Sequence, residues 1–105
     1  MESRIAKTET DDAFILKVDG ELNMSNAEEF EKELILAIQK NHKTLILDFS
    51  VLKYISSAAI RIIILCSKKL SSVNKKFKCF FEGNSKIKEI FSIAGLYSVL
   101  DIKES

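Results

Sequence analysis

Residues 46–65, ILDFSVLKYISSAAIRIIIL, decide the fold of this chain. The stretch opens with an apolar run that is typical of a buried strand and continues through a short polar connection. It then reaches two adjacent serines, Ser56 and Ser57, and a strongly apolar run that is typical of a helix. The serines are therefore expected where a strand leads into a helix.

This position gives the two serines two alternative roles. Backbone N–H groups at a helix start are unpaired and carry partial positive charge, so an anion is stabilised there. A phosphate on serine is such an anion, which makes Ser57 a candidate phosphorylation switch, with Ser56 as the alternative position. In the purely structural interpretation, Ser56 or Ser57 is simply the N-cap of the helix, because serine is common there.

The length and composition predict one folded domain over residues 1–105. The chain is 47% hydrophobic and 30% charged, which is typical of a globular protein. It contains no proline and only three glycines, so the composition indicates no linker.

The charge balance does not suggest nucleic-acid binding. Sixteen basic and fifteen acidic residues leave a net charge of +1. One local excess consists of Lys68, Lys69, Lys75, Lys76 and Lys78. We interpret it first as solvated lysines at a helix C-terminus, with a partner-binding patch as the alternative.

The cysteines and the apolar segments favour a cytoplasmic protein. Cys66 and Cys79 have apolar neighbours, so two buried thiols are the first interpretation and a disulfide is the alternative. The chain does not start with a charged leader and an apolar core, as a secretory signal would. The apolar run 58–66 is too short to cross a bilayer and contains Arg61, so no membrane association is expected.

The first forty residues predict a hairpin and a helix. Weak alternation over Ile5–Thr10 and the run Phe14–Val18 indicate two strands, and Gly20 then breaks the pattern. Apolar residues at spacings of three and four predict a helix over Asn26–Lys40. Its start resembles a capping box, formed either by Asn26 with Glu29 or by Ser25 with Glu28.

Alternating strands and helices follow, which predicts an α/β fold with the order β-β-α-β-α-β-α-β. The near-continuous apolar character of Thr44–Phe49 favours a strand covered on both faces. The helix Ser57–Ser71 is apolar nearly all round, which predicts deep burial, with Arg61 reaching the surface. The remaining expected elements are a strand at Lys76–Glu82, a third helix from Asn84 or Ser85 to a stop at Gly95, and a last strand at Tyr97–Ile102. Such an order implies helices packed on a mixed, mostly parallel sheet.

The residue types needed for catalysis are sparse. No glycine-rich phosphate loop is present, and a single histidine, His42, falls in an expected loop. Two separated cysteines and one histidine do not supply a four-ligand zinc site, so neither metal nor cofactor is expected. Ser57 has no evident histidine partner other than His42, so a hydrolytic triad is not expected. We therefore expect a protein that is bound and modified, and not an enzyme.

Three segments give a resemblance to a known family. The stretch 47–64, LDFSVLKYISSAAIRIII, resembles the phosphorylation segment of STAS domains, in particular of bacterial anti-sigma-factor antagonists. Ser57 stands at the phosphorylated position, and Ser56 stands where members carry Asp or Ser. Residues 18–22, VDGEL, resemble the segment before the first helix, and residues 85–96, SKIKEIFSIAGL, resemble the closing helix.

Two residues depart from the family pattern. Ala59 stands where Gly is usual, and its methyl group would narrow the approach of a kinase or partner to Ser57. Asn23 stands where many switch members carry Asp, a position associated with the partner surface. The resemblance implies a partner-binding set, which we take as Asn23, Ser56, Ser57, Ala59 and Arg61.

The resemblance implies a bacterial regulator of transcription that works by partner switching. The unphosphorylated domain would bind an anti-sigma factor with serine kinase activity, phosphorylation of Ser57 would release it, and a serine/threonine phosphatase would reset it. The alternative is a constitutive STAS interaction or scaffold module without a working switch. An enzyme or small-ligand carrier is the third hypothesis, and the sequence shows no convergent polar cluster for it.

Overall fold

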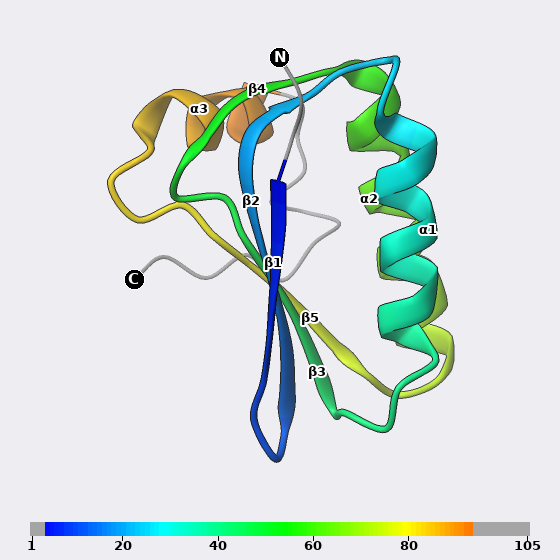
Figure 1. Cartoon of the computed structure of the whole chain (residues 1–105). Coiled ribbons are helices and arrows are strands. Elements are labelled where there is room, and N and C mark those ends of the chain that lie inside the picture. The colour runs from blue at the N-terminus through cyan, green and yellow to red at the C-terminus, as the bar shows by residue number, and fades with distance from the viewer. Residues whose placement is uncertain (1–3, 94–105) are drawn as a thin grey trace.

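The computed structural model describes residues 4–93, with five strands and three helices in that range (Figure 1). The first half contains β1 (Arg4–Glu9), β2 (Ala13–Leu22), α1 (Ala27–Ile38) and β3 (Thr44–Asp48). The second half contains β4 (Leu52–Ile55), α2 (Ser57–Ser72), β5 (Lys76–Phe80) and α3 (Ser85–Ile93). The strand expected at Tyr97–Ile102 lies outside the described residues.

The sheet is mixed and mostly parallel, as expected. β1 and β2 form the antiparallel hairpin, and the order β1-β2-β3-β5 continues with parallel pairs. β4 pairs in parallel with the last residues of β2. Strand β2 therefore lies at the centre, with β3 beside its first half and β4 beside its end.

Strand β4 was not predicted from the sequence, and β2 was predicted too short. The pairing register between β2 and β4 shifts between Gly20 and Glu21. Gly20 has a φ of +96° at this point. Glycine adopts this conformation without a side-chain clash, so the strand continues through the shift to Leu22 instead of ending at Val18. The segment expected to be a polar connection then pairs beside it as β4.

Helices cover the sheet on both sides. Helices α1 and α2 lie next to each other on one side, and α3 lies on the other side near β4 (Figure 1). Alternate residues of β2 are buried, including Phe14, Leu16 and Val18. In β3, Leu45 and Leu47 are buried and Ile46 is half-buried, so no face of this strand is exposed.

Helix α2 is less deeply buried than its sequence predicted. Its buried residues fall on one stripe, Ala59, Ile63, Cys66 and Leu70. Leu65 on another face is 49% exposed, and Arg61 is exposed as predicted. A helix packed on one face of a sheet needs only one apolar stripe, so the remaining apolar residues of α2 lie at or near the surface.

Both cysteines are buried free thiols, which confirms the first interpretation. Burial raises the pKa of the Cys66 thiol to about 12 and also raises the pKa of Cys79. Within residues 4–93, no helix is long and apolar enough to span a membrane.

Candidate phosphorylation and partner-binding site

Ser56 is the N-cap of α2. Its backbone is extended, with φ of −88° and ψ of 162°, and its hydroxyl oxygen accepts a hydrogen bond from the backbone N–H of Ala59 at 3.2 Å. Its carbonyl accepts the first helical bond, from the N–H of Ile60 at 3.1 Å. Ser56 is only 4% exposed. The sequence left open which of the two serines is the N-cap of α2, and the structure shows that it is Ser56.

Ser57 is the first residue of α2 and is exposed. The first turn of the helix contains no acidic residue, so no carboxylate of that turn offsets the positive end of the helix dipole. An anion attached at Ser57 would lie where unpaired N–H groups and this dipole favour negative charge.

Ala59 does not lie on the surface beside Ser57. Its exposed fraction is zero, and it belongs to the buried stripe of α2 that packs in the core. The methyl group therefore does not narrow the approach to Ser57, contrary to the expectation from its departure from Gly. Ala59 therefore offers no exposed atom to a partner that contacts Ser57.

Asn23 organises the turn between β2 and α1. Its Oδ1 atom accepts hydrogen bonds from the backbone N–H of Ser25, the hydroxyl of Ser25 and the backbone N–H of Asn26, at 3.0, 2.7 and 3.1 Å. The backbone N–H of Asn23 in turn donates to Oδ1 of Asn26 at 2.9 Å. A carboxylate oxygen of Asp could accept the same bonds, so Asn at this position keeps the turn and removes one negative charge.

The expected capping box of α1 is replaced by this reciprocal pair. Asn26 is the N-cap residue of α1, but its side chain makes no capping bond to the helix. Its Nδ2 atom donates instead to the carbonyl of Glu21 at 2.8 Å. The Asn26–Glu29 interpretation therefore had the correct cap residue and the wrong partner.

A backbone hydrogen bond joins this turn to the start of α2. The N–H of Ser56 donates to the carbonyl of Leu22 at 2.7 Å, and Leu22 pairs with Ile55 in the sheet. The β2–α1 turn and the first turn of α2 are thus neighbours at one edge of the sheet, at the top of Figure 1.

An exposed methionine, Met24, lies in the same turn and was missed from the sequence. Its exposed fraction is 81%. In the sequence, the available signal was an apolar residue among the polar residues of a turn.

Arg61 is exposed one helical turn after Ser57, on the same side of α2. We call Asn23, Met24, Ser57 and Arg61 the switch surface.

Asn84 holds the segment that leads into β4. Its Nδ2 atom donates to the carbonyls of Phe49 and Leu52, both at 2.7 Å. Its Oδ1 atom lies 3.4 Å from the N–H of Ile87 in the first turn of α3. The rings of Phe81, three residues earlier, and Phe91 of α3 pack edge-on against each other, with 4.8 Å between their centroids. The sequence predicted a helix start here but not the contact with residues 49–52.

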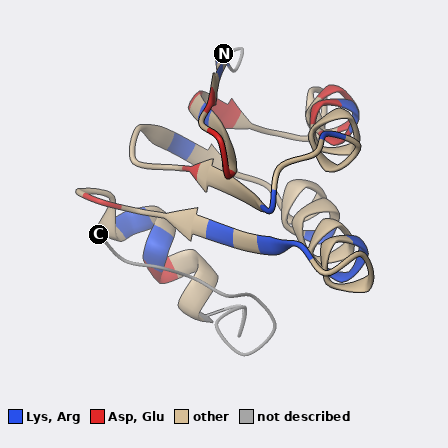
Figure 2. Ribbon diagram, turned by 90° about the horizontal axis from the view of Figure 1, so that it is seen from below, with Lys and Arg blue, Asp and Glu red and all other residues tan. Residues whose placement is uncertain are grey.

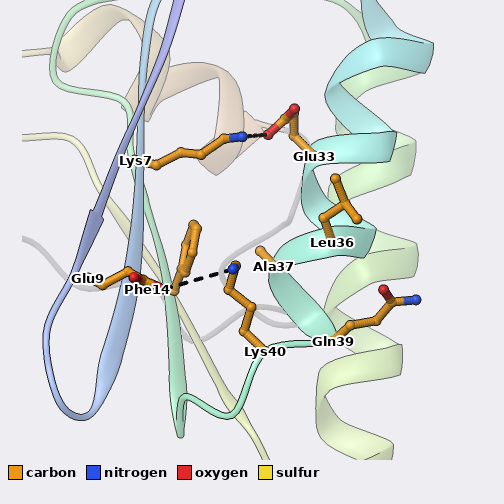
Figure 3. Close-up of a pocket in the computed structure, with 8 residues that line it drawn as sticks. All are labelled: Lys7, Glu9, Phe14, Glu33, Leu36, Ala37, Gln39 and Lys40. Carbon is orange, nitrogen blue, oxygen red and sulfur yellow. Dashed lines mark ion pairs between the residues drawn. The ribbon is translucent and has the colours of Figure 1, made fainter.

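A cavity of about 540 Å³ lies away from the switch surface, between β1, β2 and α1. Figure 3 shows that charged side chains cross it: Lys7 Nζ lies 2.6 Å from Glu33 Oε2, and Lys40 Nζ lies 3.9 Å from Glu9 Oε1. Lys40 also lies over the ring of Phe14, at 5.5 Å from its centroid. These charged pairs join the β1–β2 hairpin to α1 across the cavity.

His42 does not belong to the switch surface. Its ring packs edge-on against Phe14 at 5.4 Å, and its Nε2 atom lies 3.6 Å from Glu9. It precedes β3, whereas Ser57 follows β4, so parallel pairing places the two at opposite edges of the sheet. Among the described residues, no cluster of His, Cys, Asp or Glu could hold a metal ion.

A model of the STAS domain family matches residues 4–105. The chain therefore belongs to the STAS domain family, as its sequence motifs predicted. It is 30% identical over 102 residues to BtrV of Bordetella bronchiseptica, a match that covers 97% of this chain and 87% of BtrV. BtrV is named as an anti-sigma factor antagonist.

Solved structures share the fold. A protein of Thermotoga maritima that is named as an anti-sigma factor antagonist superposes with a TM-score of 0.85 at 25% identity, covering 96% of this chain and 86% of that one. SpoIIAA in its unphosphorylated form gives 0.81 at 17% identity, covering 97% and 88%. Bacillus SpoIIAA has also been solved in its phosphorylated form, which gives 0.74 at 17% identity and covers 97% and 91%.

Proposed function

We propose that this protein is an anti-sigma factor antagonist that works by partner switching at Ser57. Unphosphorylated, it binds an anti-sigma factor that is also a serine kinase, and the sigma factor is freed. The kinase transfers the γ-phosphoryl group of ATP to the Ser57 hydroxyl oxygen, the hydroxyl proton is lost, and ADP leaves. The observation that carries this proposal is the exposed Ser57 at the start of α2, directly after the buried cap Ser56.

Burial distinguishes the two serines as phosphorylation sites. A kinase must place the acceptor hydroxyl in line with the phosphoryl group, so the residue has to be accessible. Ser56 is 4% exposed, and its hydroxyl oxygen already accepts the bond from Ala59. Phosphorylation of Ser56 would break the cap of α2, whereas phosphorylation of Ser57 leaves it in place.

The charge of the phosphate explains both stability of the free product and release of the partner. A phosphoserine carries about −1.5 to −2 charge units, which the start of α2 and the nearby Arg61 favour in the free protein. A partner packed over Ser57 would have to accommodate the added bulk and remove water from this charge. A loss of about 3 kcal/mol in binding free energy lowers affinity more than a hundredfold.

The partners follow from the same scheme. The anti-sigma factor contacts the switch surface, with exposed Met24 supplying apolar contact area beside Ser57. A metal-dependent serine/threonine phosphatase removes the phosphate and returns the protein to its binding state. We place this cycle in the cytoplasm, where sigma factors act. The phosphorylated form of Bacillus SpoIIAA supports the assignment of such a cycle to this fold.

A constitutive interaction module is the second candidate, and it is not favoured. Its sequence support was Ala59 in place of Gly, but Ala59 is fully buried and leaves the approach to Ser57 open.

Capture from a lysate of the source organism, with wild type and Ser57→Asp as parallel baits, tests the proposal. We expect wild type, and not Ser57→Asp, to retain a kinase-fold anti-sigma factor that mass spectrometry identifies. Ser57→Ala should retain it as well, because it adds no charge. Equal capture by wild type and Ser57→Asp would favour the constitutive module.

A further inference from the structure

A groove of about 260 Å³ lies between α1 and α2. Its apolar walls are Ile35 and Ile38 of α1 with Ile62 and Leu65 of α2. Ile35 is 38% exposed and Leu65 is 49% exposed, so apolar surface faces solvent at the middle of the groove. Ile38 and Ile62 are partly buried against the core, whereas Ile35 and Leu65 lie on the solvent side of the groove. Exposed apolar surface of this kind marks interaction sites.

The two ends of the groove carry opposite charge. Glu31 of α1 lies in its lining, and Lys68 and Lys69 line it near the end of α2. Both helices start at the same edge of the sheet and run in the same direction (Figure 1), so Glu31 lies toward one end and the two lysines toward the other. Figure 2 shows acidic residues on α1 and basic residues along α2 and β5. Within residues 4–93, none of these three side chains forms an ion pair.

We propose that this groove is the interface of a symmetric homodimer. A two-fold axis perpendicular to the helices makes the helices of the two copies antiparallel. Leu65 of each copy then packs in the apolar middle of the other copy's groove, and Glu31 of each copy faces Lys68 and Lys69 of the other. The occupant is a second copy of this chain, because an apolar centre with opposite charges at its two ends is complementary to itself after such a rotation. This inference does not depend on the proposed phosphorylation of Ser57.

Sedimentation equilibrium over a range of roughly 1 μM to 1 mM tests the dimer. Wild type should show a concentration-dependent dimer, and Leu65→Lys should raise its dissociation constant at least about tenfold. Leu36→Lys is the matched control, because Leu36 is 54% exposed on α1 but lines the other cavity, not this groove. A wild type that stays monomeric throughout would overturn the proposal, as would equal weakening by both variants.

A charge-reversed pair of variants tests the antiparallel arrangement. Glu31→Lys alone places lysine opposite lysine at both ends, and Lys68→Glu/Lys69→Glu alone places glutamate opposite glutamate, so each should be weaker than wild type as a homodimer. Mixed together, the two variants should form a heterodimer in which both ends are complementary. Failure of the mixture to associate more tightly than either variant alone would overturn the proposed geometry. Thermal unfolding by circular dichroism confirms that each variant is folded.

Discussion

The hydroxyl oxygen of Ser56 accepts a hydrogen bond from the backbone N–H of Ala59, and this bond begins α2 directly beside exposed Ser57. Two adjacent serines thus have separate tasks. Ser56 satisfies a backbone donor inside the protein, and Ser57 presents the next side chain to solvent.

Ser56→Ala should destabilise the fold without removing the phosphorylation site. Loss of a serine N-cap lowers the free energy of unfolding by about 1 kcal/mol. Ser57→Ala is the matched control and should change it by less than about 0.5 kcal/mol, because an exposed side chain is lost. Urea denaturation monitored by circular dichroism measures both. A larger loss for Ser57→Ala than for Ser56→Ala would reverse the assigned roles.

Met24→Ala should weaken binding of the anti-sigma factor with little effect on stability. An apolar anchor at an interface contributes about 1–2 kcal/mol, which corresponds to roughly a five- to thirtyfold change in affinity. Val73→Ala is the control, because Val73 is also exposed but lies at the other end of α2. Isothermal titration calorimetry with the captured partner provides the measurement. Unchanged affinity for Met24→Ala would exclude this residue from the contact surface.

Lys75→Met should lower stability by about 1–2 kcal/mol, because its charged donor binds helix-terminal carbonyls. The Nζ atom of Lys75 donates to the carbonyl of Ile38 at 2.6 Å and to the carbonyl of Lys40, so it caps the end of α1 from 37 residues away. Lys76 is exposed, and Lys76→Met should be nearly neutral. Chemical denaturation of the two variants compares them, and equal losses would show that Lys75 has no special role.

The two thiols should be unreactive in the folded protein at pH 8. Burial raises the pKa of Cys66 to about 12, so the reactive thiolate is suppressed. Because the pKa of Cys66 in the folded protein exceeds the unfolded value of about 9, the folded state holds its proton longer, and the free energy of unfolding falls as the pH rises from about 9 toward 12. A colorimetric thiol reagent should therefore react slowly with native protein and at once with both thiols in urea. Fast reaction in the native state would show that the thiols are accessible.

Local patterns in the sequence were sufficient to predict most of the helices and strands. The helical periodicity of α1 and the apolar run of β3 each fix an element within one stretch of chain. Strand β4 was missed because its pairing depends on the register shift at Gly20, which no local pattern of residues 52–55 reveals. The burial of α2 was overestimated because sequence shows how apolar a helix is and not how many of its sides are covered.

The candidate site was predicted only in part for a similar reason. The motif around Ser57 identified the serine pair, but the choice of Ser56 as the cap required the backbone of β4. Asn23 bonds to Asn26, and Lys75 bonds across the fold to the end of α1. Such partners depend on turn geometry and on contacts between distant segments, which single-residue propensities do not contain.

The most direct test of partner switching is the affinity of the captured anti-sigma factor for this protein before and after phosphorylation, with the modified residue mapped by mass spectrometry. We expect a single phosphate on Ser57, none on Ser56, and a loss of affinity of more than about a hundredfold. Incubation with the phosphatase should restore the original affinity. Phosphorylation at Ser57 with unchanged affinity, or no phosphorylation of wild type by its kinase partner, would contradict the proposed switch.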